Sequence, residues 1–114
     1  MMINTSAGIP VTSELLHNYF TTLVNRFFKI LPMREAEDAS LSLYMQSLQK
    51  ELLGCKEFIP ELCNDAVYLS LLGSLQYLID NPECTVREVR REVFNAISLC
   101  NKLRAVYTER GLQN

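Results

Sequence analysis

The chain has 114 residues, 48% of them hydrophobic and 21% charged, with four glycines, four prolines and a formal net charge of −2. This length holds one domain and excludes a doubly wound α/β fold with a second domain or an eightfold α/β barrel. The high apolar content indicates a globular chain rather than a disordered one. The near-neutral charge argues against a bulk polyanion binder.

Residues 1–12 are expected to form an extended, flexible arm, and residues 13–110 a single helical domain. A first helix is predicted from residue 13 to residue 31, because apolar side chains recur there at helical spacing until Pro32 stops the pattern. These apolar positions are Leu15, Leu16, Tyr19, Phe20, Leu23, Val24, Phe27, Phe28 and Leu31.

A second helix is predicted to end at Leu53. Three acidic residues, Glu35, Glu37 and Asp38, precede it, where the start of a helix favours negative charge. Gly54 follows its last turn, and a glycine in this place is typical of a left-handed helix stop.

Residues 55–64 are predicted to form a connection with one helical turn begun by Pro60. Asp65 is suited to cap a third helix over residues 66–79. That helix is apolar nearly all round, which is typical of a helix in the middle of a fold.

A turn over residues 80–84 precedes Thr85 and Glu88, which form a capping-box pattern for a fourth helix that reaches about Thr108. No strand is predicted. At a rise of ~1.5 Å per residue the fourth helix is ~34 Å long and the third ~20 Å, so the far end of the fourth needs the first helix or another molecule beside it. Four helices joined by short turns predict an all-α fold, a compact four-helix bundle with mostly antiparallel neighbours.

The residues give little support to catalytic, metal or cofactor chemistry. The chain has one histidine, His17, and only Glu14 lies one helical turn from it, which does not make a nucleophile with a base and an orienting carboxylate. Seven residues separate Cys55 from Cys63 rather than the two to four of a zinc site, and the glycines are too scattered for a phosphate loop. We therefore expect no enzyme activity, no cofactor and no metal.

The four cysteines, Cys55, Cys63, Cys84 and Cys100, are expected to be buried free thiols, with two disulfides in one of three pairings as the alternative. The first ten residues contain neither the basic nor the apolar segment of a secretory signal. The longest uncharged stretch, residues 66–79, is too short to cross a bilayer. A soluble cytoplasmic protein without a membrane partner is expected.

The first and fourth helices carry wider apolar arcs than the ~100° stripe of a surface helix. Uncovered arcs of this width mark interaction surfaces, unless the arm or the connection over residues 55–64 folds across them. The candidate interface residues are Tyr19, Phe20, Phe27, Phe28, Phe94, Leu99 and Val106. The leading hypothesis is a non-enzymatic interaction module that forms a homo-oligomer such as a dimer, or docks a protein partner, through these two helices.

The charges are distributed unevenly. Residues 1–31 carry a net +1, residues 32–84 carry −6 and residues 85–114 carry +3. A small nucleic-acid-binding regulator is the alternative hypothesis, and its candidate contacts on the fourth helix are Arg87, Arg90, Arg91 and Lys102. An ordinary solvated face is the simpler interpretation, because Glu88 and Glu92 lie on the same helix.

Two segments resemble sequences found elsewhere. They are Arg26-Phe-Phe-Lys-Ile-Leu-Pro-Met-Arg-Glu and Tyr44-Met-Gln-Ser-Leu-Gln-Lys-Glu-Leu-Leu-Gly-Cys. The resemblance covers most of the chain after residue 20. That part of the chain looks like short uncharacterised helical proteins of bacteria, some of them carried on prophages or mobile elements. The resemblance implies an intracellular bacterial or phage-derived interaction protein, and it brings no site residue and no activity.

Overall fold

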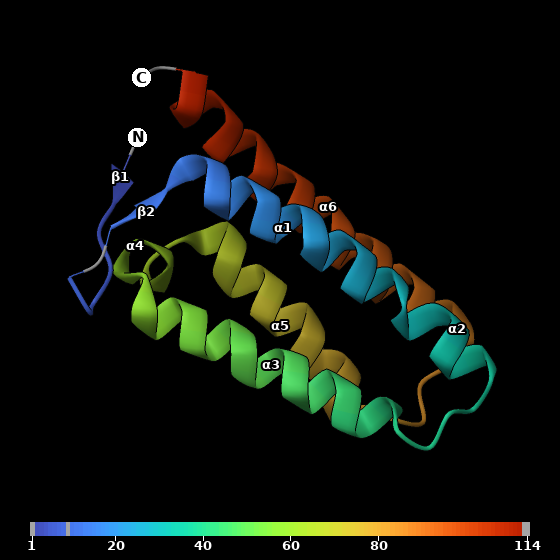
Figure 1. Ribbon diagram of the computed structural model, residues 1–114. Coiled ribbons are helices and arrows are strands. Elements are labelled where there is room, and N and C mark those ends of the chain that lie inside the picture. Colours follow the sequence, from blue (N-terminus) through green and yellow to red (C-terminus); the bar gives the residue numbers. More distant parts are fainter. Residues whose placement is uncertain (1, 9, 113–114) are drawn as a thin grey trace.

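The computed structural model describes residues 2–8 and 10–112, and within them the chain is mostly helical, with one small antiparallel sheet. The strands are β1 (Met2–Ile3) and β2 (Val11–Thr12), and the helices are α1 (Ser13–Phe28), α2 (Ile30–Glu35), α3 (Leu41–Phe58), α4 (Pro60–Cys63), α5 (Ala66–Asp80) and α6 (Val86–Leu112). The sheet and α4 lie at one end of the molecule, and α2 lies at the other (Figure 1). The prediction of a compact all-α fold is confirmed in this general form.

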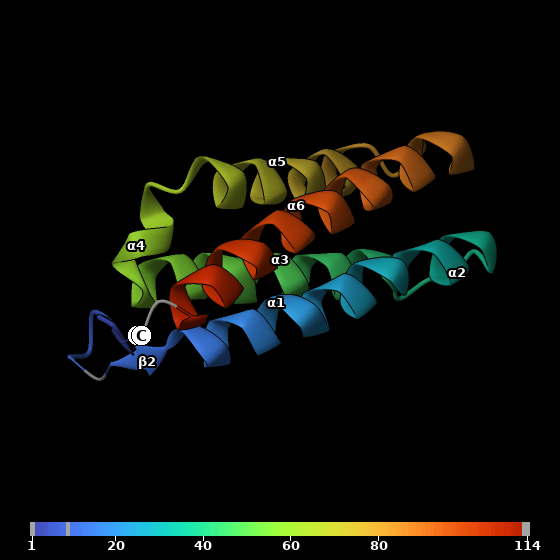
Figure 2. The ribbon, with the colours of Figure 1, turned by 90° about the horizontal axis from the view of Figure 1, so that it is seen from above.

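Helix α6 is the element against which α1, α2 and α5 pack. Its most extensive contact is with α1, followed by α5, and it also contacts α2, whereas α3 packs mainly on α5. Figure 2 shows α6 running obliquely between α5 and α1. The expectation that the far end of this long helix has α1 beside it is confirmed.

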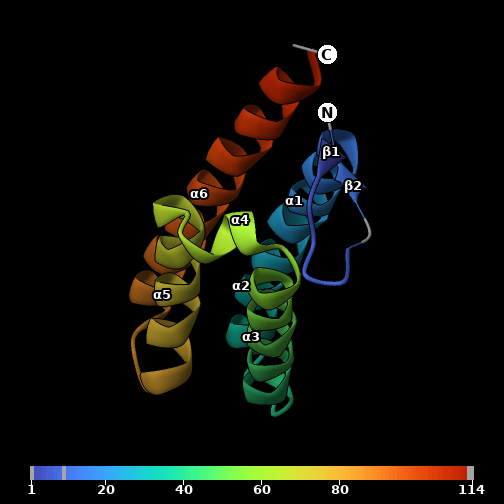
Figure 3. The same cartoon turned by 90° about the vertical axis from the view of Figure 1, so that its left-hand side faces the viewer.

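Helix α5 does not take the central place predicted from its apolar composition, so that prediction is wrong. It packs against α6 and α3, and Figure 3 shows it on one side of the molecule, joined to α3 through α4. Its buried side chains, among them Leu71, Leu75 and Leu78, occupy one face. The opposite face is open to solvent and carries Leu69 and Tyr77 among small and polar side chains.

The core contains an aromatic cluster that joins three helices. The Phe20 ring of α1 stacks on Tyr107 of α6 with centroids 5.7 Å apart, and it meets Tyr68 of α5 edge to face at 6.2 Å. All three side chains are fully buried. The Tyr68 hydroxyl donates a hydrogen bond to the carbonyl oxygen of Leu52, 2.5 Å away, so its polar end is satisfied inside the core.

Pro32 breaks the first predicted helix, but the helix ends three residues earlier than expected. Helix α1 ends at Phe28, and a separate helix α2 begins at Ile30. Proline has no N–H with which to bond the carbonyl of residue 28, and its ring crowds that carbonyl. Pro32 itself fits within the first turn of α2, where backbone N–H groups have no partner inside the helix.

The prediction that Gly54 ends the second long helix is wrong, because α3 continues to Phe58. A glycine inside a helix costs about 1 kcal/mol relative to alanine, which a helix anchored by buried side chains can bear. Leu52 before the glycine and Ile59 after it are both buried. Burial on both sides of Gly54 therefore outweighs the preference of glycine for a helix stop.

The predicted caps are present. Asp65 accepts a hydrogen bond from the Tyr68 N–H at 3.0 Å and caps α5, and Thr85 accepts one from the Glu88 N–H at 3.1 Å. Pro60 is the first residue of α4, the predicted single helical turn. Each of these signals is a local hydrogen bond or a fixed backbone angle, so it acts whatever the rest of the chain does.

The connection between α2 and α3 is closed by a Schellman motif. The N–H of Glu37 donates to the carbonyl of Arg34 at 3.1 Å, and the N–H of Asp38 donates to the carbonyl of Met33 at 2.9 Å. Glu37 has φ of 54°, in the left-handed region where glycine is usual. The three acidic residues expected at a helix start thus include one that ends the preceding helix.

The arm before α1 contains a pair of strands that the sequence did not predict. Met2 pairs with Thr12 and Ile3 with Val11. The Ile3 side chain is 2% exposed and belongs to the core, and the Ser6 N–H donates to the carbonyl of Phe58 at 2.7 Å. This segment is therefore fastened to the end of α3.

Candidate interaction surface

Two of the seven residues predicted to form an interface lie in the core. Phe20 and Phe27 are 0% exposed, so they are corrected from surface to core residues. The wide apolar arc of α1 is covered on this side because α6 lies along it. Two edges of the arc remain open to solvent, one at Leu15, which is 56% exposed, and one at Phe28.

At the edge marked by Phe28, this residue of α1 meets Phe94 of α6. Their side chains are 41% and 48% exposed, and the two rings meet edge to face with centroids 5.8 Å apart. Phe28 is the last residue of α1, and Phe94 lies in the first half of α6, and the packing of α6 along α1 brings them together. Single exposed apolar side chains are ordinary on protein surfaces, but two exposed aromatic rings in contact form a contiguous apolar patch, the kind of feature that marks interaction surfaces.

The other three candidate interface residues lie apart from this pair. Tyr19 is half-buried, and its hydroxyl donates to a Glu51 carboxylate oxygen at 2.9 Å. Leu99 is half-buried against the core. Val106 is 44% exposed, but it follows Phe94 by twelve residues and so points about 120° away around the helix.

Three arginines flank Phe94 on the same face of α6. Arg87, Arg90 and Arg91 precede it by seven, four and three residues, the spacings that place side chains together on one face of a helix. All three are exposed. Arg90 lies 3.6 Å from a Glu35 carboxylate oxygen, so this contact links the basic face to α2. The surface formed by Phe28, Phe94 and the three arginines is called the aromatic–basic surface below.

The remaining basic candidate, Lys102, is exposed two turns beyond Phe94. Arg91 has Glu92 as a neighbour at 3.8 Å. The four residues proposed as nucleic-acid contacts are therefore all accessible, but two of them stand beside carboxylates of the protein itself.

A polar network joins α1 to α3 away from the aromatic–basic surface. Arg26 forms an ion pair with Glu51, which also accepts the hydrogen bond from Tyr19. Burial raises the pKa of Glu51, but the hydrogen bonds from Arg26 and Tyr19 outweigh burial and leave it below its usual value. Burial raises the pKa of Tyr19 above its ordinary range. These groups hold each other in place and leave no free nucleophile.

His17 has a structural position. Its Nδ1 atom lies 3.2 Å from the carbonyl oxygen of Arg104 and 2.7 Å from the Thr108 hydroxyl, so the imidazole ties α1 to α6. Glu14 on the same helix is exposed. Among residues 2–8 and 10–108, no group of three metal-ligating side chains is close enough to hold a metal ion.

All four cysteines are free thiols, but they are not all buried as predicted. Cys84 and Cys100 are buried, Cys55 is half-buried and Cys63 is exposed on α4. Burial raises the pKa of Cys100 to about 12.

The uncharged outer face of α5 is a feature that the sequence interpretation missed. Leu69 and Tyr77 are 42% and 36% exposed there, and Gly73 between them is also exposed. The signal was present in the run of uncharged residues from 66 to 79, but it was assigned to the centre of the fold.

Within the part of the chain that the structure describes, no helix has the length and apolar character needed to span a membrane. Comparison of the chain with protein-family models, with curated protein sequences and with solved structures found no match.

Proposed function

We propose that this chain is a non-enzymatic interaction module of a bacterial or phage-derived cytoplasmic protein, built as a mostly antiparallel four-helix bundle. Its docking site is the aromatic–basic surface of α1 and α6. The single observation that carries the proposal is the edge-to-face pair of Phe28 and Phe94, which stays 41% and 48% exposed while the neighbouring Phe20 and Phe27 are fully buried. Exposed aromatic anchors beside arginines are the residue types that most often dominate binding energy at protein interfaces.

The charge of this surface favours a partner that carries acidic residues around an apolar anchor. Arg87, Arg90 and Arg91 surround Phe94, and complementary charge both steers encounter and fixes the orientation of the bound segment. An amphipathic helix with acidic flanks fits this description. A twofold dimer through the same patch would bring the arginines of both copies to one interface, so self-association through this surface is the less favourable arrangement.

Nucleic-acid binding remains the second candidate function, supported by the exposure of Arg87, Arg90, Arg91 and Lys102. Two features weigh against it. The first is the proximity of Glu35 and Glu92 to two of the arginines, and the second is the aromatic pair, which phosphate binding does not need.

The test uses a designed helical peptide with leucine and phenylalanine at i, i+3, i+4 and i+7 and glutamates beside them. Fluorescence anisotropy should show saturable binding that weakens as salt rises, and Phe94→Ser should weaken it by at least about tenfold. Tyr77→Ser is the matched control, because Tyr77 is an exposed aromatic residue on a different helix, and it should leave the affinity unchanged.

Equal binding by wild type and Phe94→Ser would overturn the proposal. Salt-dependent retention of duplex DNA or RNA that is lost when the four basic residues become alanine, and unaffected by Phe94→Ser, would establish the second candidate instead. Sedimentation over a concentration series identifies self-association, which would contradict the choice of an acidic partner if it also depended on Phe94.

A further inference from the structure

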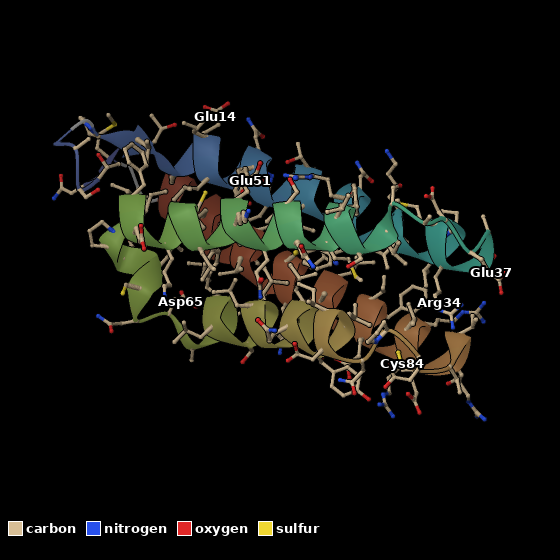
Figure 4. All side chains as sticks on the ribbon, turned by 90° about the horizontal axis from the view of Figure 1, so that it is seen from below. Glu14, Arg34, Glu37, Glu51, Asp65 and Cys84 are labelled. Atoms are coloured by element: carbon tan, nitrogen blue, oxygen red, sulfur yellow. The ribbon has the colours of Figure 1, made fainter. Side chains whose placement is uncertain are left out.

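A cavity lies at the end of the molecule opposite the β-hairpin. Its volume is about 310 Å³, and it is enclosed by α2, the connection to α3, the first turns of α3, the last turn of α5 and the turn before α6. Figure 4 shows Arg34 and Cys84, two of its lining residues, close together at this end, far from Asp65. The aromatic–basic surface does not contribute to its wall.

The wall of the cavity is mostly apolar. The apolar lining residues that are themselves buried come from five segments of the chain, α2, α3, α5, the turn before α6 and α6 itself, and they are Ile30, Met45, Leu78, Cys84 and Val89. Met33, Leu41, Ile79 and Pro82 complete this part of the wall. An apolar cavity of about 300 Å³ or more with a few polar groups is the usual form of a small-molecule site.

Among the residues that the structure describes, Arg34 is the one cation in this wall. One of its terminal nitrogens donates to the carbonyl oxygen of Cys84 at 3.0 Å, which holds the guanidinium against the turn before α6. Its Nε–H is buried and has no hydrogen-bond partner among the described residues. A buried donor without an acceptor is unfavourable, and because this Nε–H has no accessible surface, it gains an acceptor from a ligand only when the Arg34 side chain shifts on binding.

The acidic residues of the lining do not neutralise Arg34 from within. Glu37 and Asp38 are both exposed, at the rim, where solvent screens their charge. One Asp38 carboxylate oxygen already accepts hydrogen bonds from the Ser40 N–H at 2.8 Å and the Ser40 hydroxyl at 2.6 Å. The charged group that is partly withdrawn from solvent is therefore the guanidinium.

We infer that this cavity binds a small aliphatic carboxylate, with the hydrocarbon chain against the apolar wall and the carboxylate on the Arg34 guanidinium. A planar guanidinium with unused N–H groups matches the two oxygens of a carboxylate. The half-burial of Arg34 and the apolar wall strengthen this pairing, because little water competes for either partner.

The probe for the test is octanoate, used below the concentration at which it forms micelles, with octan-1-ol as the uncharged comparison. Titration followed by two-dimensional NMR should shift the backbone amides of residues 30–45 and 78–89 in a saturable manner. Arg34→Gln should weaken octanoate binding at least about tenfold and leave octanol binding unchanged, since only the carboxylate depends on the charge. Arg34→Lys keeps the charge but not the planar geometry, so its octanoate affinity should lie between those of the wild type and Arg34→Gln.

Three controls keep the outcome interpretable. Ser42→Trp places a bulky side chain in the lining and should abolish binding of both probes. This result tests the cavity independently of whether Arg34→Gln folds. Glu14→Gln removes an exposed carboxylate outside the lining and should leave octanoate affinity within about twofold. Phe94→Ser should have no effect, which separates this site from the aromatic–basic surface. No shift of these amides at millimolar octanoate, or equal octanoate affinity in wild type and a folded Arg34→Gln, would overturn the inference.

Discussion

Phe28 of α1 and Phe94 of α6 meet ring edge to ring face with centroids 5.8 Å apart, while 41% and 48% of the two side chains remain exposed. An exposed aromatic pair of this kind adds ~0.5–1.5 kcal/mol to stability. We therefore expect Phe94→Ala to lower the free energy of unfolding by about 1 kcal/mol, measured by urea denaturation. Phe20→Ala removes a fully buried ring from the core and should cost ~3–5 kcal/mol. Similar losses for the two variants would show that Phe94 is a core residue rather than a docking residue.

Glu37 offers a stabilising substitution. It closes the Schellman motif after α2 with φ of 54°, and a side chain in this region costs roughly 1–2 kcal/mol that glycine does not incur. Glu37→Gly should raise the free energy of unfolding by about 1 kcal/mol and increase the melting temperature by several degrees. Glu37→Ala is the control, since it keeps the Cβ atom and should bring no gain. A gain with alanine as large as with glycine would locate the strain in the carboxylate instead of the backbone.

Gly54 offers a second stabilising substitution, in which a glycine is replaced rather than introduced. It lies inside α3, and a Cβ atom built on it meets no other atom within 4 Å. Gly54→Ala should therefore stabilise the protein by ~0.5–1 kcal/mol, because alanine restricts the unfolded chain and favours the helix. Gly8→Ala is the matched comparison: Gly8 has φ of 76°, so alanine should destabilise there. Thermal unfolding of both variants checks the pair, and a loss of stability in Gly54→Ala would contradict the helical geometry at that position.

Stability should fall in acid through Glu51. Its pKa is lower in the folded chain than the ordinary value of 4.5 because Arg26 and Tyr19 bond the carboxylate. The contribution is thus complete at pH above 4.5 and disappears as pH falls through the lower folded pKa. Since this side chain is 43% exposed, the contribution should be no more than about 1 kcal/mol. Urea denaturation between pH 3 and pH 7 should show a shallower pH dependence for Glu51→Gln, and an unchanged slope would rule out this role.

The four thiols should react in the order of their exposure. Cys63 is exposed and should be alkylated first, followed by the half-buried Cys55. The pKa of Cys100 is raised to about 12, so at pH 8 only about one molecule in ten thousand carries its thiolate, and the group is also shielded. Mass spectrometry after timed iodoacetamide treatment should find Cys100 labelled only when denaturant is added. Early labelling of Cys100 in native buffer would indicate that α6 opens frequently.

The elements that could be predicted from the sequence are those with local causes. Asp65, Thr85 and Pro60 act through a hydrogen bond or a fixed angle within one helical turn, so their roles are visible in the sequence alone. Gly54 misled because glycine is compatible with both a helix stop and a helix interior, and the choice depends on distant burial. Glu37 gave no signal because the left-handed position after α2 is filled by a residue that does not prefer it.

The candidate surface was only partly predictable for a geometric reason. Phe27 and Phe28 are neighbours in sequence but ~100° apart around α1, and the wide apolar arc did not indicate which of them would be covered. That depends on where α6 crosses, which is a tertiary property. The cavity beside Arg34 was not predictable at all, since its wall combines residues from both halves of the chain.

The pairing of α1 with α6 also has a consequence during synthesis. Phe20 and Phe27 are covered by a helix whose residues are made some 60 to 90 positions later. At ~5–20 residues per second, the newly made α1 therefore waits several seconds on the ribosome with its aromatic face uncovered. Chaperones that recognise short aromatic stretches can bind α1 during that interval. They can no longer do so once α6 has emerged and packed against it.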